Sequence, residues 1–209
     1  MKIAVLGTGD VGSTLGRRWA EKGHSVIFGS RNPRSDKVRK LLAAAGPNAK
    51  AAGNAEAVAS AEVVVLATPW DAARQVLESV GNWTGKVLVD CTNPVAPDFQ
   101  LALGMTTSAG EQVAAWARGA RVVKAFNSTG WNNMADPIYH GEPITMFIGG
   151  DDAEAKKVVA RLAEDLGFEV VDAGGLVTAR YLEPLAMLWI HLAVVQKLGR
   201  DVAFKLVRR

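Results

Sequence analysis

The residue types and spacing best suited to chemistry lie close to the amino terminus, in the run Gly7-Thr8-Gly9-Asp10-Val11-Gly12. The run has the spacing GxGxxG, directly follows an apolar segment of strand length, and opens a segment of helical period. In that setting Gly7 permits a tight turn, Gly9 lets the backbone approach a diphosphate, and Gly12 lets a helix pack closely on a sheet. The free amides at the start of the helix then face the phosphates. We therefore predict a dinucleotide site at this loop, contacted by all six residues of the run.

A basic turn further along the chain indicates which dinucleotide is bound. An NAD site usually carries an acid about 20 residues after the glycines to bind the ribose 2′-hydroxyl, whereas an NADP site accepts a 2′-phosphate. Here the turn reads Gly29-Ser30-Arg31-Asn32-Pro33-Arg34 and contains no acid. Its guanidinium groups and hydroxyl can bind a phosphate, although a basic surface turn is the alternative, and Asp36 could compete for either arginine. We predict NADP(H) as the cofactor, contacted in this turn by Ser30, Arg31, Asn32 and Arg34.

Three more loops follow predicted strands, at the edge where ligands bind in a doubly wound sheet. They read Thr68-Pro69-Trp70, Cys91-Thr92-Asn93-Pro94 and Phe126-Asn127-Ser128-Thr129. Asn93 and Asn127 can bind a carboxamide, while Trp70 and Phe126 offer flat apolar surface. Each residue also has a structural interpretation, since a lone tryptophan is more often core than a stacking platform. We predict that the cofactor is contacted here by Thr68, Pro69, Trp70, Asn93 and Asn127.

The predicted edge lacks an obvious acid or base. His24, His140 and His191 all lie elsewhere in the sequence, and an alcohol dehydrogenase needs a proton acceptor within hydrogen-bond reach of the hydroxyl. Lys124 and Asp71 are the titratable candidates, and each is more typical of a structural or solvated residue. We therefore assign no catalytic residue and no metal ligand. Either the acceptor takes hydride without a protein acid, as a flavin-like ring could, or the chain only binds the nucleotide.

The elements that must position these loops alternate between apolar runs of strand length and segments of helical period, from residue 3 to about residue 172. We predict an α/β fold with a Rossmann-type, doubly wound, mostly parallel sheet. The predicted strands are 3–6, 25–29, 62–68, 87–90, 121–125, 144–148 and 168–172. The predicted helices include one that follows the glycine run, one at 35–45, a short one capped by Asn54, and one that begins with a capping box of Asp151 and Glu154.

From about Thr178 onward the pattern is helical and apolar on several sides, so this helix must be covered by its own domain or by a second copy of the chain. We predict an NADP-binding domain at 1–175. A helical appendage at 176–209 is expected to close the cleft and to contribute to a homodimer.

Composition excludes several other classes of protein. The 209 residues are 49% hydrophobic and 22% charged, as in a folded protein, and a net charge of +3 without a dense basic run indicates no nucleic-acid partner. The apolar stretch 185–195 falls short of the roughly 20 residues of a membrane span, and the amino terminus lacks a secretory signal. The single cysteine, Cys91, fits a reducing compartment. We expect a cytoplasmic protein.

The motifs together resemble those of the NADPH:coenzyme F420 oxidoreductase family. The resemblance is carried by Gly7 to Gly12, Gly29 to Pro33, Thr68-Pro69-Trp70, Gly149 to Asp152 and Asp172-Ala173-Gly174. The closing segment, Leu182 to Leu206, is similar to the C-terminal helices of the family, so the resemblance covers nearly the whole chain. The turn Gly-Ser-Arg-Asn-Pro is also shared with the nucleotide-binding domain of the six-transmembrane ferric reductases.

The resemblance implies that NADP(H) lies along the glycine loop, with Thr8, Ser30 and Arg31 at positions that bind its phosphates. It also implies that a deazaflavin stacks on the nicotinamide, in a cleft closed by the C-terminal helices, and exchanges hydride with it directly. The segment 126–131 departs from archaeal members, which carry a histidine at the position of Asn127. An ordinary flavin, a quinone or another small acceptor therefore stays open.

Two other functions are consistent with the glycine run. An NADP-dependent reductase of imines or β-hydroxyacids needs a larger helical domain than the roughly 35 residues that follow position 174. A nucleotide-binding module that delivers electrons to a partner protein, or senses nucleotide for it, is the second alternative.

Overall fold

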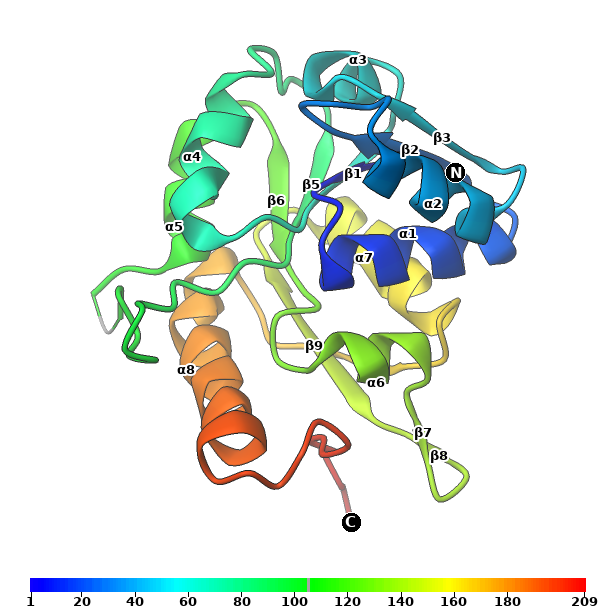
Figure 1. Cartoon of the computed structure of the whole chain (residues 1–209). Coiled ribbons are helices and arrows are strands. Elements are labelled where there is room, and N and C mark those ends of the chain that lie inside the picture. The colour runs from blue at the N-terminus through cyan, green and yellow to red at the C-terminus, as the bar shows by residue number, and fades with distance from the viewer. Residues whose placement is uncertain (105) are drawn as a thin grey trace.

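A sheet with helices on both faces organises the chain (Figure 1). The computed structural model describes residues 1–104 and 106–209. The sheet has eight strands in the order β10-β9-β6-β5-β4-β1-β2-β3. Their bounds are β1 Lys2–Leu6, β2 Ser25–Gly29, β3 Ala49–Ala52, β4 Val63–Leu66, β5 Val87–Asp90, β6 Arg121–Lys124, β9 Thr145–Gly150 and β10 Glu169–Asp172. The predicted α/β, doubly wound, mostly parallel sheet is confirmed.

The direction of the last two strands differs from a simple run of βα units. Strands β1 to β6 pair in parallel, but β9 runs antiparallel to β6, and β10 then pairs in parallel with β9. Between β6 and β9 the chain forms helix α6, Trp131–Ala135, and a small hairpin of β7, Ile138–Tyr139, and β8, Glu142–Pro143. Because of this segment the chain re-enters the sheet at the end where β6 stops, so β9 runs antiparallel to β6.

Alternate residues of β1, β2, β4, β5 and β6 contribute to two separate hydrophobic cores. Ile3 and Val5 of β1 face one core, which they share with helices α1 and α7, whereas Ala4 and Leu6 face the other, which they share with α3, α4 and α5. A strand buried on both faces reads as a continuous apolar run, which is why these strands were recognisable. The helices are α1 Asp10–Glu21, α2 Asp36–Ala45, α3 Asn54–Ala59, α4 Trp70–Glu78, α5 Ala109–Trp116, α7 Ala153–Glu164 and α8 Ala179–Ile190.

Two predicted helix caps are wrong by one residue. Asn54 is the first residue of α3, whose N-cap is Gly53. Asp152, rather than Asp151, caps α7 and accepts a hydrogen bond from the amide of Ala155. Asp151 instead accepts one from the amide of Leu176, so it connects the start of α7 to the chain before α8.

The C-terminal segment is helical over a shorter range than predicted. After α8 a π-helical turn covers His191–Val195, and the described residues 196–209 form neither helix nor strand. Lys197 and Gly199 both have positive φ, at 58° and 84°, which ends the helix. The chain then folds back, and the amide of Thr145 in β9 donates to the carbonyl of Phe204. Among the described residues, no helix is long and apolar enough to cross a bilayer.

Packing of α1 on the sheet generates a first prediction. A methyl group at Gly16 would lie 2.4 Å from Cε1 of the buried ring of Phe28. We expect Gly16→Ala to lower the free energy of unfolding by about 1–3 kcal/mol, because the core must shift to admit it. Urea denaturation measures the change. The matched control is Arg17→Ala on the same helix, half-exposed and expected to cost less than about 0.5 kcal/mol. An equal effect of the two variants would contradict this packing.

Candidate functional site

The three glycines of the first loop occupy places where a side chain would disturb the backbone or a ligand. A Cβ at Gly7, whose φ is +119°, would lie 2.3 Å from the carbonyl oxygen of Ala67, so this loop touches the end of β4. A Cβ at Gly12 would lie 2.2 Å from the carbonyl oxygen of Gly7 and 3.2 Å from Val5 Cγ1. A Cβ at Gly9 would meet no described atom within 4 Å. The turn, the open approach and the close helix packing are therefore present as predicted.

The loop lies where anions bind in this class of sheet. It follows β1, which pairs with β2 on one side and with β4 on the other, so the order of strands reverses here. Helix α1 begins directly after Gly9, and no described side chain caps its first amides. Free amides and the positive end of the helix dipole favour a phosphate at this point.

The basic turn after β2 presents its cations to solvent. Arg31, Asn32 and Arg34 are exposed, and the hydroxyl of Ser30 accepts a hydrogen bond from the amide of Asn32. Asp36 forms its ion pair with Arg39 rather than with either arginine of the turn. Within the described part of the chain, Arg31 and Arg34 have no carboxylate partner. Both guanidinium groups are therefore available to an anionic ligand.

Two buried oxygens near the carboxyl ends of β4 and β6 lack a hydrogen-bond partner. They are Oγ1 of Thr68 and Oδ1 of Asn127, neither of which meets a donor among the described residues. The amide nitrogen of Asn127 donates to Oδ1 of Asn93 at 3.1 Å and to the carbonyl of Leu182 at 3.0 Å. Leaving a buried acceptor unpaired costs about 1–3 kcal/mol, so each of these oxygens needs a partner from water or from a ligand.

The aromatic residues near this edge are engaged in packing. Trp70, the first residue of α4, stacks on Trp116 of α5 with ring centroids 5.2 Å apart. The expectation that Phe126 offers flat surface to a ligand is wrong, because Phe126 is buried and makes edge-on contacts with Trp19 and Phe168. Its φ of 59° marks a sharp bend after β6. Pro69 is exposed at the start of α4, and Trp70 as a cofactor contact stays a prediction.

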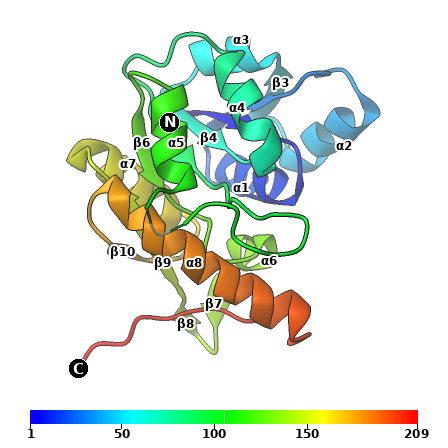
Figure 2. The same ribbon diagram turned by 90° about the vertical axis from the view of Figure 1, so that its left-hand side faces the viewer.

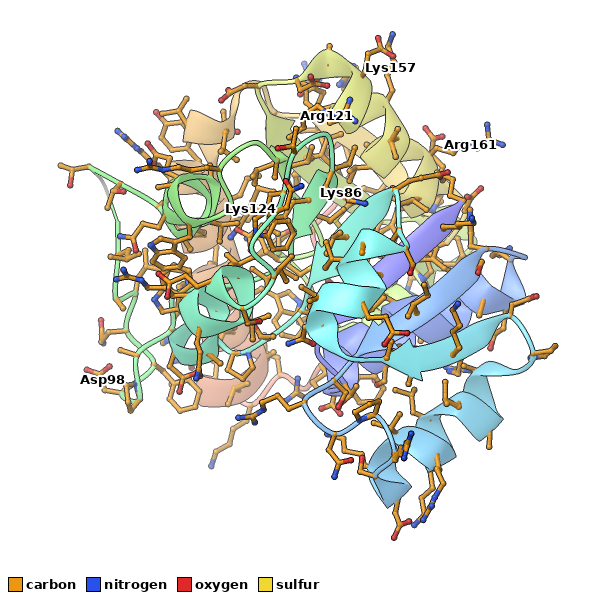
Figure 3. All side chains as sticks on the ribbon, turned by 90° about the horizontal axis from the view of Figure 1, so that it is seen from above. Lys86, Asp98, Arg121, Lys124, Lys157 and Arg161 are labelled. Carbon is orange, nitrogen blue, oxygen red and sulfur yellow. The ribbon has the colours of Figure 1, made fainter. Side chains whose placement is uncertain are left out.

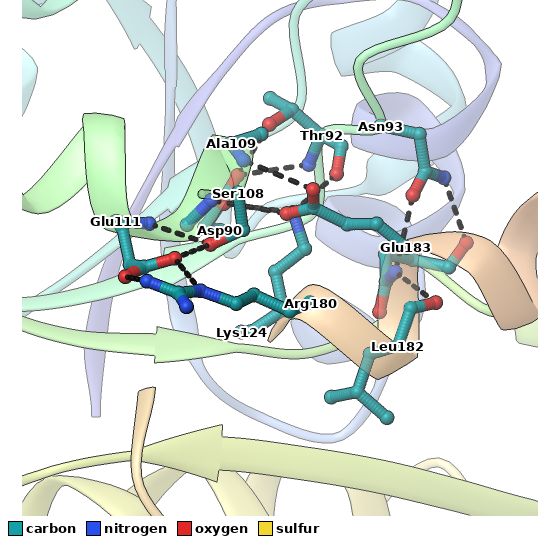
Figure 4. A network of polar contacts seen from close by, with 12 residues as sticks. Asp90, Thr92, Asn93, Ser108, Ala109, Glu111, Lys124, Arg180, Leu182 and Glu183 are labelled. Carbon is teal, nitrogen blue, oxygen red and sulfur yellow. Dashed lines mark hydrogen bonds and ion pairs between the residues drawn. The ribbon is translucent and has the colours of Figure 1, made fainter. Parts of the chain in front are cut away.

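A buried group of charges lies next to this edge (Figure 4). The ammonium of Lys124, at the end of β6, is 2.9 Å from a carboxylate oxygen of Asp90 at the end of β5. It is also 2.9 Å from Oε1 of Glu183 in α8, and all three side chains are at most 1% exposed. In Figure 3 Lys124 lies among interior side chains, whereas Lys157 and Arg161 point outward from α7. We name Asp90, Lys124 and Glu183 the buried triad.

The electrostatics of the buried triad keep its lysine charged. Burial lowers the pKa of Lys124, but the two neighbouring carboxylates outweigh this effect, so its pKa lies above the ordinary value. Its protons are donated to Asp90, Glu183 and the carbonyl of Thr92. Lys124 is thus a structural cation rather than a proton acceptor. Burial likewise raises the pKa of the Cys91 thiol, and Asp71 is exposed at the start of α4.

Glu183 is the residue that sequence reasoning missed. It is the one acid between Tyr181 and Gln196, and it precedes Pro184 inside an otherwise apolar helix. A fully buried carboxylate is rare unless it is paired, so an isolated acid in such a segment predicts a buried partner. The identity of that partner depends on tertiary structure.

Comparisons with known proteins agree with this geometry. The family model described as NADP oxidoreductase, coenzyme F420-dependent, matches residues 2–94. The F420-dependent NADP reductase of Methanothermobacter thermautotrophicus is 35% identical, over 93% of this chain and 90% of its own length. A candidate F420-dependent NADP reductase from Arthrobacter sp. FB24, known as a crystal structure, is 36% identical with a TM-score of 0.91, and each chain is covered completely.

More distant similarities concern part of a longer protein or the fold alone. Metalloreductase STEAP3 of Rattus norvegicus is 34% identical over 89% of this chain, which spans 36% of that protein. A reductive aminase from Aspergillus terreus is 20% identical, with a TM-score of 0.69 over 94% of this chain and 62% of that one, and it shares the fold. On the full-length similarity above, this chain belongs to the F420-dependent NADP reductase family of oxidoreductases.

Proposed function

We propose that this chain transfers hydride between NADP(H) and coenzyme F420. The observation that carries the proposal is the pair of buried, unpartnered oxygens, Thr68 Oγ1 and Asn127 Oδ1, on the same sheet edge as the glycine loop. An amide-bearing ligand would satisfy both. Membership of the reductase family supports the same conclusion.

The nucleotide end of the site would be held by backbone and by cations. The amides that open α1 face the diphosphate, with Thr8 beside them, and Gly9 leaves the space for it. Arg31 and Ser30 would bind the 2′-phosphate, because a guanidinium makes charge-assisted, two-pronged hydrogen bonds to phosphate. Arg34 adds positive charge nearby. These residues fit NADP(H) better than NAD(H), since the turn carries no acid.

The nicotinamide end would be fixed by neutral groups. Asn127 Oδ1 is placed to accept from the carboxamide nitrogen, and the hydroxyl of Thr68 can donate to the carboxamide oxygen. When bound, the nicotinamide and the deazaflavin supply the redox chemistry themselves. The chain would bind and orient them, while the buried triad keeps Lys124 from exchanging protons with them. This assignment needs no catalytic acid or base.

A second candidate function is supported by the similarity to a segment of STEAP3. This chain matches only 36% of that longer metalloreductase. The similarity therefore supports a nucleotide-binding module that delivers electrons to a partner protein or senses nucleotide for it. The proposed reductase would oxidise NADPH with a small-molecule acceptor in solution, whereas the module would need its partner protein.

We further propose a cytoplasmic homodimer that buries the outer face of α8. Tyr181 and Leu188 of this helix are 74% and 48% exposed, and the exposed Val177 and Val195 lie in the helical turns directly before and after it. An apolar face of this kind is typical of an interface between protein chains. The free, buried thiol of Cys91 is consistent with a reducing compartment.

The 2′-phosphate contact leads to a prediction about Arg31. We expect Arg31→Ala to weaken NADPH binding by about tenfold to 100-fold, and NADH binding far less, because only NADPH loses a charge-assisted contact. Fluorescence titration of both nucleotides measures this. Arg39→Ala is the matched control, since Arg39 is already paired with Asp36. Equal weakening of NADPH and NADH would show that Arg31 does not contact the phosphate.

The acceptor can be identified by steady-state kinetics. With NADPH as donor and a panel of F420, flavin and quinone acceptors, we expect F420 to be reduced mole for mole as NADPH is oxidised. If the chain oxidised NADPH with a flavin or a quinone but not with F420, that flavin or quinone would be the acceptor instead of F420. NADPH binding without turnover on any acceptor would favour the electron-delivery or sensing module.

The dimer is tested by sedimentation velocity at micromolar concentration. We expect the unmodified chain to sediment as a dimer and Leu188→Glu as a folded monomer, because a buried charge disrupts an apolar interface. Lys157→Glu, on the exposed face of α7, is the control and should leave the dimer intact. A monomeric unmodified chain would rule out the interface.

A further inference from the structure

Glu183 joins the C-terminal helix to the sheet directly beside Asn127. We propose that Glu183 is a positioning residue: it holds α8 so that the neighbouring Leu182 carbonyl fixes Asn127 with Oδ1 directed at the nicotinamide carboxamide. The proposal rests on the proposed function for its ligand, although the placement of Asn127 can be tested without any nucleotide.

The orientation of Asn127 is fixed from two sides. Its amide nitrogen donates one proton to Asn93 Oδ1 and the other to the Leu182 carbonyl, while the amide of Asn93 donates to the Asn127 carbonyl at 2.8 Å. If the side-chain amide were rotated by half a turn, its oxygen would face two acceptors. Only one orientation is therefore compatible with the contacts. It leaves Oδ1 as a buried acceptor for a ligand N–H.

One of these two contacts depends on the position of α8. The Leu182 carbonyl belongs to the backbone of that helix, and the next residue, Glu183, is its deepest polar anchor. Oε1 of Glu183 pairs with Lys124 and accepts from the amide of Gly110 at 3.0 Å, and Oε2 accepts from the amide of Ala109 at 2.9 Å. These amides open α5, where a negative charge is favoured by the helix dipole.

The chain also provides a matched contact between the same two helices. Glu111 of α5 pairs with Arg180 of α8 at 2.6 Å, and both side chains are partly exposed. The hydrogen bond from Arg180 holds the pKa of Glu111 below its usual range, so this pair is charged at neutral pH. Neither residue bonds Leu182 or Asn127 in the described structure. Removing the Glu111–Arg180 pair should therefore weaken the contact between α5 and α8 while leaving the hydrogen bonds of Asn127 in place.

The first experiment measures Asn127 itself, in protein free of nucleotide. The side-chain NH₂ signal, assigned with Asn127→Asp, should exchange slowly with solvent in the unmodified chain, because both protons are donated inside the protein. In Glu183→Gln the new NH₂ group would face the N–H donors of Lys124, Ala109 or Gly110, and this repulsion would shift α8. We therefore expect the Asn127 NH₂ group to exchange at least about tenfold faster. Glu111→Gln should leave the rate unchanged. Unchanged exchange in folded Glu183→Gln would overturn the proposal.

The second experiment measures the consequence for binding. NADPH is compared with its 3-acetylpyridine analogue, in which a methyl group replaces the carboxamide NH₂. We expect Glu183→Gln to weaken NADPH by about threefold to tenfold and to leave the analogue nearly unaffected, because the analogue has no proton to donate to Asn127. Equal loss for both ligands would show that Glu183 acts on the fold as a whole, and the positioning role would be wrong.

Two further results separate the proposal from the function on which it rests. Failure of the unmodified chain to bind NADPH would contradict the proposed function, while the exchange measurement would still decide whether Glu183 places Asn127. If Glu183→Gln does not fold, Glu183→Asp keeps the charge but shortens the side chain by one methylene, and it is expected to show the same two effects to a smaller degree.

Discussion

The ammonium of Lys124 is sealed from water, and the arrangement of the sheet edge around it depends on that constraint. A buried cation must be matched by carboxylates with good geometry, and here these come from the end of β5 and from α8. Removing Lys124 would leave the carboxylates of Asp90 and Glu183 without their shared cation inside the protein. The buried triad therefore holds together elements that are far apart in the sequence: β5, β6, α5 and α8. Figure 2 shows α8 crossing the molecule below α5, where this contact is made.

The glycine loop contributes a constraint of another kind, since it depends on the absence of side chains. Gly7 and Gly12 allow backbone atoms to approach so closely that any Cβ would collide with a carbonyl oxygen. The first loop can therefore lie directly against the end of β4, which carries Thr68. Exposed cations after β2, backbone amides after β1 and buried neutral oxygens after β4 and β6 therefore follow one edge of the sheet, the edge where ligands bind in doubly wound folds.

Local features of this fold were predictable because they leave a local pattern. Buried strands such as 25–29 and 87–90 read as apolar runs, and the roles of the glycines follow from their spacing. Strand β3 was missed because Ala-Lys-Ala-Ala contains no β-branched or aromatic residue. The contacts of Glu183 and the packing of Phe126 could not be read from the chain, since each depends on residues brought together only by the tertiary fold.

The C-terminal helix is fastened at both ends, which limits how the molecule can change shape. Glu183 holds its first half, and Trp189 donates to the carbonyl of Val202 in the returning tail, which itself pairs with β9 through Phe204. A lid that swings needs a free end, and α8 has none. Any displacement of α8 would therefore have to break the contacts of the buried triad or the hydrogen bonds of the returning tail.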